Sequence, residues 1–388
     1  MTARIEWVRQ GCRMLSSIAA EFERTQPFAG MTMGTGIHLE PKTVALLLTL
    51  KAGGADVVST GNLNSTQPSA VDYLRANGVT VIGGPTRDPA ERAGHLDEVL
   101  GREPHIILDN GGDLFARYLD HPYARLIGGT EETTSGRNRL APLRDAIARP
   151  ILVINDSPIK QFAENRHSVG QAVLESFLRI TNRATNGRRV TVFGYGPCGQ
   201  GVAENFRNAH AVVSVVEVDP VRRLQAVYDG FAVPDKATAL RTAQIVVTVT
   251  GARDVIVPID LDVMSDDLVL MNAGHFPAEI DVDGLAACPE VAALEPGDDG
   301  IVTLRLADGR RIHILGRGHM INLAGPRPLG NSIESMDLGF SLQARSLEAV
   351  AVRAVGPESC IVPVPRVVDE LVAEAYMVTT GAVATGSR

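Results

Sequence analysis

The stretch VTVFGYGPCGQG, residues 190–201, decides the fold of this 388-residue chain. A short apolar run leads directly into the glycines Gly194, Gly196 and Gly199, and a helical stretch follows them. A second apolar run, VVSVVEVD, comes next and carries Glu217, eighteen residues after Gly199. A lone GxGxxG is a weak signal. The strand before it, the helix after it and the acid beyond it together predict a Rossmann dinucleotide-binding unit.

Each part of this unit has a physical task in holding a dinucleotide. The glycines let the backbone approach a pyrophosphate at a helix N-terminus. The alternative is that they serve only close packing. The Glu217 carboxylate should accept hydrogen bonds from ribose hydroxyls and repel a 2′-phosphate, although Arg222 could in principle reach the same position. We therefore expect NAD rather than NADP as the cofactor.

The rest of the chain alternates short apolar runs with helical stretches. Continuous rather than alternating apolar runs are typical of parallel strands buried on both faces. The pattern predicts an α/β fold of two doubly wound parallel-sheet domains. The expected strands are Ala55–Ser59, Val79–Ile82, His105–Leu108, Arg125–Ile127, Ile151–Ile154, Val190–Phe193, Val212–Val218, Ile245–Val249 and Leu268–Met271. The expected helices are Thr43–Leu50, Ala70–Ala76, Ala90–Leu100, Ser168–Asn182, Gly199–Ala209 and Val221–Asp229.

The composition is that of an ordinary globular protein and excludes several classes of function. The net charge of −8 and the lack of a basic stripe make nucleic acid an unexpected partner. The longest apolar run is about seven residues, whereas a membrane span needs about 20, and no apolar leader is present. The four cysteines lie far apart without a CxxC pair, which excludes a disulfide scaffold or a Cys-rich zinc site. We expect a cytoplasmic protein with no bound metal and no membrane contact.

Six further segments resemble the S-adenosylhomocysteine hydrolase family and occur in the family's order. They are DNGGDL (109–114), EETTSG (131–136), NDSPIK (155–160), EVDP (217–220), NAGHFPAEID (272–281) and GHMINL (318–323). The resemblance runs from about residue 10 to residue 376. It implies a substrate domain of residues 1–165 plus 331–365, an inserted Rossmann NAD domain of residues 170–330, and a C-terminal tail of residues 366–388.

The resemblance also implies a redox-masked elimination. In the family, bound NAD oxidises the 3′-hydroxyl of a nucleoside, and the ketone makes the neighbouring 4′ C–H acidic. A base removes that proton, the 5′ substituent leaves, water adds, and the hydride returns to the sugar. Oxidation comes first because an unactivated ribose C–H is far too weak an acid to lose its proton.

Carried over by motif, the resemblance gives individual residues roles. Lys160 and Glu132 would hold the hydroxyl that is oxidised, since a buried lysine beside a carboxylate can have its pKa brought into working range. His275 would lie near the substrate, and His38 is a candidate acid or base at the leaving group. Beyond the glycine loop and Glu217, the expected cofactor contacts are Thr133, Thr134, Ser135, Asn165, Thr248, Thr250, Asn272 and Asn322.

The chain departs from the family around the nucleoside. Glu40 stands where the family has Thr, and Lys42 stands where an acidic or amide residue reads the adenine amino group. Asn110 replaces a carboxylate credited with proton transfer, and Asn331 replaces a histidine. Glu40 could take over the lost carboxylate's task, or it could be only an acid at a helix N-terminus. The expected catalytic set is His38, Glu40, Asp109, Glu132, Lys160, Glu164 and His275, with Asn110, Asn331 and Met336 at the substrate.

Three interpretations remain open. The sequence first favours an enzyme that oxidises the sugar of a modified adenine nucleoside, eliminates water or a thiol, and reduces the ketone again. A dehydratase in nucleoside-antibiotic assembly, of the angustmycin type, is one branch. The second is hydrolysis of S-adenosylhomocysteine or S-inosylhomocysteine, a reaction of one-carbon metabolism. The third is an inactive NAD-binding regulatory protein. For the enzyme we expect a nucleoside substrate and a homo-oligomer, either dimer or tetramer.

Overall fold

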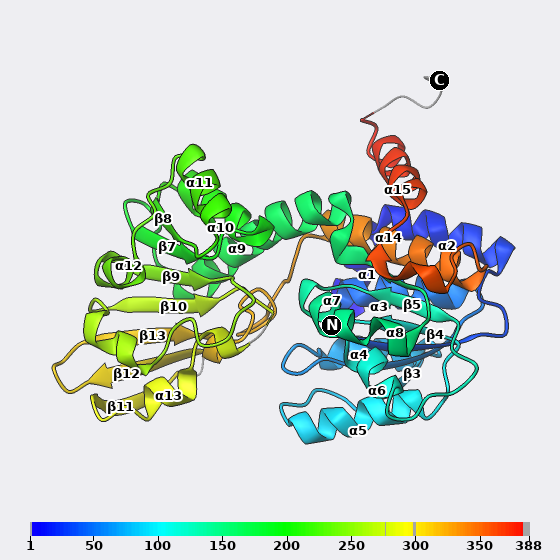
Figure 1. Cartoon of the computed structure of the whole chain (residues 1–388), viewed down its shortest axis with the longest axis horizontal. Helices are drawn as coiled ribbons and strands as arrows, with labels where there is room; N and C mark the ends of the chain where they lie inside the picture. The colour runs from blue at the N-terminus through cyan, green and yellow to red at the C-terminus, as the bar shows by residue number, and fades with distance from the viewer. Residues whose placement is uncertain (1, 276, 298–299, 383–388) are drawn as a thin grey trace. The chain divides into compact units, whose positions relative to one another are not determined.

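The computed structural model describes residues 2–275, 277–297 and 300–382, which form two compact units (Figure 1). Unit 1 contains the chain up to Ala163 and again from Ile333, and unit 2 is Glu164–Ser332. Each unit is an α/β layer structure built on a seven-stranded sheet. The expectation of two α/β domains, one of them a Rossmann unit inserted in the other, agrees with this division.

The sheet of unit 1 is entirely parallel, as its continuous apolar runs predict. Its strand order is β14-β6-β5-β4-β1-β2-β3. The strands are β1 (Thr32–Ile37), β2 (Asp56–Gly61), β3 (Thr80–Ile82), β4 (Ile106–Asp109), β5 (Gly128–Glu131), β6 (Ile151–Val153) and β14 (Cys360–Pro363).

Helices cover both faces of this sheet with separate apolar clusters. One cluster gathers α1, α2, α3, α4 and α14 through residues such as Leu15, Leu46 and Phe340. The opposite cluster gathers α5 to α8 through residues such as Val99 and Phe115. The helices of unit 1 are α1 (Thr2–Gly11), α2 (Arg13–Thr25), α3 (Pro41–Ala52), α4 (Pro68–Ala76), α5 (Pro89–Leu100), α6 (Asp113–Tyr118), α7 (Thr134–Leu140), α8 (Arg144–Ile147), α14 (Ile333–Ala351) and α15 (Arg366–Thr379).

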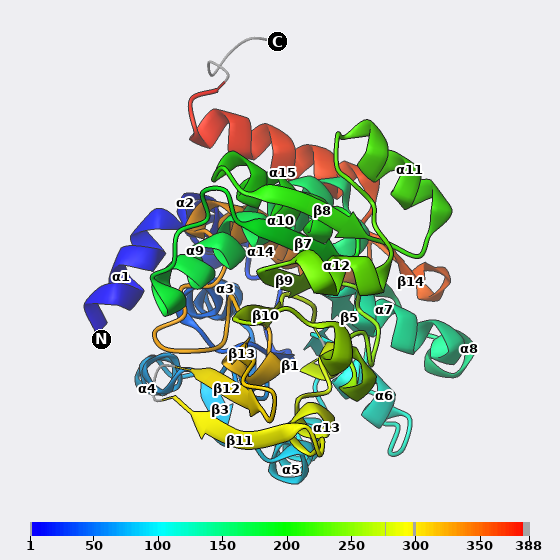
Figure 2. The ribbon, with the colours of Figure 1, turned by 90° about the vertical axis from the view of Figure 1, so that its left-hand side faces the viewer.

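The sheet of unit 2 is mixed, and Figure 2 lets its strands be followed in the order β8, β7, β9, β10, β13, β12 and β11. The strands β8, β7, β9 and β10 are parallel, as expected, and β13 pairs parallel with β10, whereas β12 is antiparallel to both of its neighbours, β13 and β11. The strands are β7 (Arg189–Phe193), β8 (Val212–Val216), β9 (Ile245–Thr248), β10 (Leu268–Asn272), β11 (Val291–Pro296), β12 (Ile301–Leu306) and β13 (Arg311–Leu315).

The helices of unit 2 also pack on both faces. Phe177 and Phe206 bring α9 and α10 onto one face, and Leu240 and Leu285 bring α12 and α13 onto the other. A π-helical segment, Lys160–Ser168, leads into α9. The helices are α9 (Val169–Thr181), α10 (Pro197–Asn208), α11 (Pro220–Tyr228), α12 (Lys236–Thr242) and α13 (Val282–Ala286).

Two expectations about the elements are wrong. Residues 125–127 form no strand, and the strand at that point is β5, which follows directly at Gly128–Glu131. The segment 366–388 is more than a tail, because α15 packs Val368 and Val372 against α14. The sequence also led us to expect frayed residues over 378–388, but α15 continues to Thr379, and residues 383–388 lie outside the described residues. Among the described helices, none is long and apolar enough to cross a membrane.

Candidate active site

The motif residues of unit 1 follow the ends of neighbouring parallel strands. His38 follows β1, Asn62 follows β2, Asn110 follows β4 and Glu132 follows β5. The pairing of β4 with β5 sets Asp109 directly beside Glu131. Because the carboxyl ends of parallel strands meet at one edge of the sheet, these residues collect there, where α/β proteins bind ligands.

Asp109 and Glu131 form a buried carboxyl pair that shapes this edge. Asp109 accepts from the backbone N–H groups of Asn110 at 2.9 Å and Phe115 at 3.0 Å. Burial raises the pKa of Asp109, and burial together with the charge of Asp109 raises the pKa of Glu131. The structure therefore places Asp109, an expected catalytic residue, against the backbone of its own loop. Glu131, which the sequence did not single out, accepts from Gly111, Gly112 and Thr133 in the same way.

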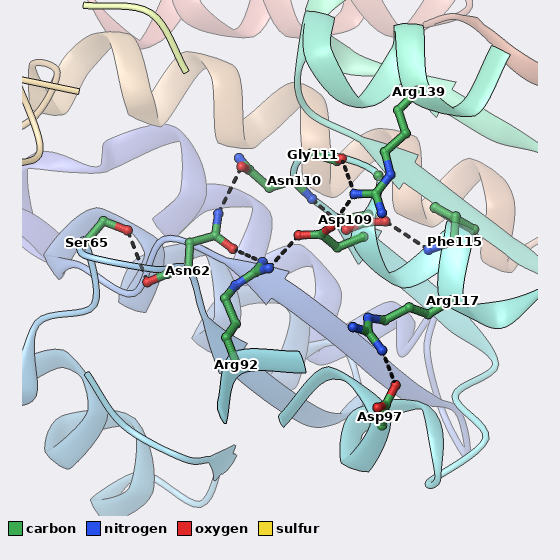
Figure 3. A network of polar contacts seen from close by, with 12 residues as sticks. Asn62, Ser65, Arg92, Asp97, Asp109, Asn110, Gly111, Phe115, Arg117 and Arg139 are labelled. Carbon is green, nitrogen blue, oxygen red and sulfur yellow. Dashed lines mark hydrogen bonds and ion pairs between the residues drawn. The ribbon is translucent and has the colours of Figure 1, made fainter. Parts of the chain in front are cut away.

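Two side-chain amides connect β2, β4 and β5 at this edge, and Figure 3 shows the first of these contacts, between Asn62 and Asn110. Asn62 Nδ2 donates to Asn110 Oδ1 at 3.1 Å, and Asn110 Nδ2 donates to Glu132 Oε2 at 2.8 Å. All three residues are buried. The structure thus joins the expected residues Asn110 and Glu132. Sequence reasoning missed Asn62, which stands in the polar run NLNSTQ just after an apolar strand.

His38 and Glu40 lie in the turn that joins β1 to α3. His38 Nδ1 is 2.5 Å from Ser65 Oγ, and the Thr43 hydroxyl donates to the His38 carbonyl at 2.6 Å. These contacts hold the ring and the backbone of His38. Glu40 is the N-cap residue of α3, but its side chain makes no capping hydrogen bond.

Glu40 instead forms a buried ion pair with Lys42. Glu40 Oε2 lies 2.9 Å from Lys42 Nζ, and the two side chains are only 5% and 4% exposed. A buried pair of this kind persists only when each charge stays close to its partner, because removing either one leaves the other desolvated and uncompensated. Glu40 and Lys42, both of which differ from the family pattern that this turn resembles, therefore act together. The Glu40 carboxylate is an acceptor held beside the Lys42 ammonium, a donor.

Other expected residues fall in two groups. Lys160 begins the π-helical segment in unit 1 and is buried, while Glu164 and Asn165 lie further along the same segment in unit 2. Asn331 Nδ2 donates to Glu164 Oε1 at 3.3 Å, so Glu164 and Asn331 form one contact. Met336 belongs to the apolar cluster that α14 shares with the sheet of unit 1, and its expected place at the substrate stays a prediction.

The glycine loop in unit 2 has the geometry that a pyrophosphate needs. Gly194 has φ of +101°, and a Cβ there would meet the Val249 carbonyl oxygen at 2.7 Å. Gly196 is the N-cap residue of α10, and its nearest neighbour is Arg222 Nη1, 3.5 Å from an ideal Cβ. A Cβ at Gly199 would lie 2.1 Å from the Gly194 carbonyl oxygen. Gly194 and Gly199 therefore serve close packing, and Gly196 leaves the helix N-terminus open to a ligand.

Glu217 lies beside this loop, as expected. Its Oε2 atom accepts from the Tyr195 N–H at 2.7 Å, and its Oε1 atom accepts from Val218 at 2.6 Å and Asp219 at 2.9 Å. The carboxylate therefore fastens the end of β8 to the glycine loop. A dinucleotide's ribose would meet it there.

Hydrogen bonds hold the other expected cofactor residues of unit 2 in place. Thr248 Oγ1 donates to Asn272 Oδ1 at 3.2 Å, at the ends of β9 and β10. Thr250 is held by Glu279, which accepts from its N–H at 2.9 Å and its hydroxyl at 2.8 Å. Burial raises the pKa of Glu279. Glu279 was not among the expected residues, although it stands in the motif NAGHFPAEID that carries His275.

The expected cofactor residues of unit 1 form a helix cap. The Thr133 hydroxyl accepts from the Gly136 N–H at 2.9 Å and lies 3.0 Å from Ser135 Oγ, while Thr134 begins α7. Thr133, Thr134 and Ser135 are thus one turn after Glu132. They belong to a different unit from the glycine loop.

The residues present fit NAD. Besides the open N-terminus of α10 and Glu217, unit 2 holds Asn322 with its Oδ1 buried and without a hydrogen-bond partner among the described residues. Its Nδ2 donates to Asn331 Oδ1 at 3.1 Å. A buried carbonyl oxygen without a donor is suited to receive a carboxamide N–H, the kind of group that a nicotinamide carries.

Comparison with known proteins places this geometry in a family. Residues 165–327 match the model "S-adenosyl-L-homocysteine hydrolase, NAD binding domain", and residues 3–120 match "S-adenosyl-L-homocysteine hydrolase". The chain is 40% identical over 384 residues to the S-inosyl-L-homocysteine hydrolase of Methanopyrus kandleri, covering 97% of this chain and 90% of the relative. It is 36% identical over 387 residues to an adenosylhomocysteinase of Thermococcus kodakarensis, again covering 97% and 90%.

A second S-inosyl-L-homocysteine hydrolase, from Methanothermobacter thermautotrophicus, is 36% identical over 386 residues, covering 97% of this chain and 91% of the relative. These matches confirm both the resemblance and the expectation of NAD. The chain belongs to the S-adenosyl-L-homocysteine hydrolase family and is an NAD-dependent, adenosylhomocysteinase-like enzyme.

Proposed function

We propose that this enzyme releases homocysteine from an S-nucleosyl-homocysteine whose purine carries an oxygen at position 6, as in S-inosyl-L-homocysteine. The buried pair of Glu40 and Lys42, 2.9 Å apart, is the observation that carries this proposal. A 6-oxopurine presents an acceptor oxygen beside an N1–H donor, and adenine presents the opposite pattern. An ammonium only donates and a carboxylate only accepts, so the pair matches the first pattern and opposes the second.

The relatives support the same substrate class. Two of the proteins that match over 97% of this chain are named S-inosyl-L-homocysteine hydrolases, including one at 40% identity. Others of similar identity are named adenosylhomocysteinases. Sequence identity alone therefore leaves the purine base open, and the chemistry of the ion pair supports the inosyl substrate.

The chain's own residues divide the chemistry. The glycine loop, Glu217 and Asn322 would hold NAD, which would supply a reversible hydride acceptor for the sugar carbon that carries the hydroxyl. Glu132 and Lys160 hold the sugar hydroxyl, and one of them takes its proton as the hydride leaves. After a base removes the 4′ proton, the C5′–S bond breaks and His38 gives the departing sulfur a proton. Water then adds across the double bond before the hydride returns.

In a second candidate function, the reaction stops before water adds, so that the product is an unsaturated nucleoside. The fixed amide of Asn110 favours it. Its Oδ1 accepts from Asn62 and its Nδ2 donates to Glu132, so it cannot take up a proton as the carboxylate usual in the family could. A nucleoside that loses water in this way would make the enzyme a dehydratase.

The experiment incubates the purified enzyme with S-inosyl-L-homocysteine, S-adenosyl-L-homocysteine, inosine and adenosine. Free thiol is measured with a colorimetric reagent and nucleosides by mass spectrometry. We expect thiol and inosine from the inosyl substrate, at a kcat/KM at least about tenfold above that of the adenosyl substrate, the size of about one good hydrogen bond to a charged group. A nucleoside lighter by one water would instead support the dehydratase. Bound NAD without any turnover would support a regulatory protein.

Variants make the test specific. Lys42→Gln should reduce the preference for the inosyl substrate, whereas Lys51→Gln, whose exposed lysine donates to the Gly78 carbonyl, should not. Lys160→Ala should lower turnover of every substrate by about 10²–10⁴-fold while NAD stays bound. An unchanged ratio of the two substrates in Lys42→Gln would remove the ion pair from base recognition.

A further inference from the structure

Arg92, on α5, lies behind the amides of the candidate site and takes part in no motif discussed so far. Figure 3 shows its guanidinium reaching Asn62 on one side and the start of α6 on the other. Its Nη2 atom donates to Asn62 Oδ1 at 2.6 Å, and its Nη1 atom donates to Asp113 Oδ2 at 2.5 Å. The side chain is only 11% exposed.

Arg92 fixes the direction of every hydrogen bond that follows it. A guanidinium can only donate, so Asn62 must turn its oxygen to Arg92 and its NH₂ to Asn110. Asn110 must then turn its oxygen to Asn62 and its NH₂ to Glu132. This series of hydrogen bonds begins at a guanidinium, which has no acceptor atom, and ends at a carboxylate. Reversing either amide would therefore place a donor against a donor or an acceptor against an acceptor.

The surroundings of Arg92 indicate that it is held for this contact at some energetic cost. Its Nε atom is buried and has no hydrogen-bond partner among the described residues, a situation that typically costs about 1–3 kcal/mol. Asp113 supplies the counter-charge and is also bonded by Arg139. Burial acts to raise the pKa of Asp113, but the two arginines outweigh it and hold that pKa below its usual value. The ion cluster therefore holds the Arg92 guanidinium in place.

We propose that Arg92 is a positioning residue for oxidation of the sugar. Through Asn62 and Asn110 it keeps an N–H aimed at Glu132, the residue expected to hold the sugar hydroxyl. The inference rests on the proposed role of Glu132, but it does not depend on which base or leaving group the substrate carries. It also accounts for the amide at position 110, because a carboxylate there could not donate to Glu132.

The test compares Arg92→Met with Arg117→Met. Arg117 on α6 pairs with Asp97 on α5 at 2.6 Å, so it links the same two helices by an ion pair that has no bond to the amides (Figure 3). Inosine and adenosine, which lack the thiol leaving group, are mixed with the NAD-loaded enzyme. The absorbance of reduced cofactor is followed over a single turnover, with NAD content and the thermal midpoint measured alongside.

We expect Arg92→Met to slow cofactor reduction by about 10²-fold, the usual size of a misplaced reacting group, with NAD content unchanged. Arg117→Met should reduce the cofactor at the wild-type rate. Arg92→Lys, which keeps a charged donor, should restore part of the loss. Equal losses in Arg92→Met and Arg117→Met, or a wild-type rate in Arg92→Met, would overturn the inference.

A second variant guards against misfolding of Arg92→Met. Asn62→Asp keeps an acceptor for Arg92 but can no longer donate to Asn110 Oδ1. We expect it to slow cofactor reduction as much as Arg92→Met does, and the two changes to be non-additive when combined. Full additivity would mean that the two residues act separately, and it would refute the proposed series of hydrogen bonds from Arg92 to Glu132. Failure of the wild type to release thiol, with cofactor reduction intact, would refute the proposed function alone.

Discussion

Glu217 serves both the fold and the choice of cofactor with one carboxylate. It accepts three backbone N–H groups at 2.6 to 2.9 Å, which fasten the glycine loop to β8. A carboxylate has about four lone-pair sites, so ribose hydroxyls can still be accepted beside these bonds. Arg222 lies next to Gly196, where the phosphate groups would lie. We therefore expect Glu217 to keep a 2′-phosphate away from a glycine loop that has the cation Arg222 beside it.

This arrangement predicts how the cofactor preference can be changed. We expect Glu217→Ser to weaken NAD binding and to allow NADP binding, because the repulsion is lost while Arg222 remains. The ratio of the two dissociation constants should change by at least about tenfold, equal to about 1.4 kcal/mol. Calorimetric titration of both cofactors measures it. The gain in NADP binding should disappear in Glu217→Ser/Arg222→Ala, and its persistence there would show that Arg222 plays no part.

The residues expected to carry the chemistry stand in recognisable motifs, whereas the residues that support them do not. Lys160, Glu132 and Glu217 stand in motifs whose order and spacing are informative. Arg92 and Asn62 are thirty positions apart, and their contact leaves no periodic pattern in the chain. Met336 packs in the apolar core of unit 1, a contact that none of the quoted motifs indicates. Only the fold reveals such contacts.

Among the elements, apolar runs indicated the strands rich in Val, Ile and Leu and missed those built on glycine. β1 reads TMGTGI, and a Cβ at Gly34 would lie 2.7 Å from Pro104 Cγ. β5 reads GGTE, and a Cβ at Gly129 would lie 1.8 Å from the Ile107 carbonyl oxygen. Close packing excludes side chains at these positions, so the strands lack the apolar signal. The antiparallel pair β12 and β13 mostly alternates in burial, a different pattern from the fully buried parallel strands.

Asp337 of α14 caps another helix, α2. The N-cap residue of α2, Cys12, makes no side-chain capping bond, and Asp337 accepts from the backbone N–H groups of Met14 and Leu15 at 2.9 Å each. Burial raises the pKa of Asp337 to about 6, although these two donors act in the opposite direction. The folded protein therefore holds a proton there more tightly than the unfolded chain, whose Asp titrates near pH 3.9.

The stability of the protein should depend on pH accordingly. The contribution of protonated Asp337 is fully present below about pH 4 and is lost as pH rises through about 6. Asp337→Asn cannot titrate, so its stability relative to the wild type should rise between pH 4.5 and pH 8, by roughly 2 kcal/mol. Urea unfolding at both pH values measures this. Asp72→Asn, on the exposed side of α4, should track the wild type, and parallel curves for Asp337→Asn would contradict the assignment.

At the scale of the whole molecule, we propose a homo-oligomer and expect light scattering to report a dimer or a tetramer. Large apolar side chains of α11, among them Val221, Leu224 and Tyr228, are exposed, and clustered exposed apolar groups commonly mark contacts between proteins. Val221→Glu combined with Tyr228→Glu should lower the measured mass, since burying two unpaired charges is unfavourable. A monomeric wild type would refute the proposal, and an unchanged mass in the variant would place the contact elsewhere.

The two units should respond differently to NAD. Unit 2 contains the glycine loop, Glu217 and Asn322, so we expect the protein to purify with NAD bound and unit 2 to lose more stability when NAD is removed. A ligand present at a thousand times its dissociation constant stabilises the state it binds by about 4 kcal/mol. The single tryptophan, Trp7, lies on α1 of unit 1, so fluorescence reports on that unit while calorimetry reports on both. Removing NAD should move the calorimetric midpoint more than the fluorescence midpoint. Equal shifts would mean that the residues of unit 1, Thr133 among them, hold the cofactor as strongly as the Rossmann unit does.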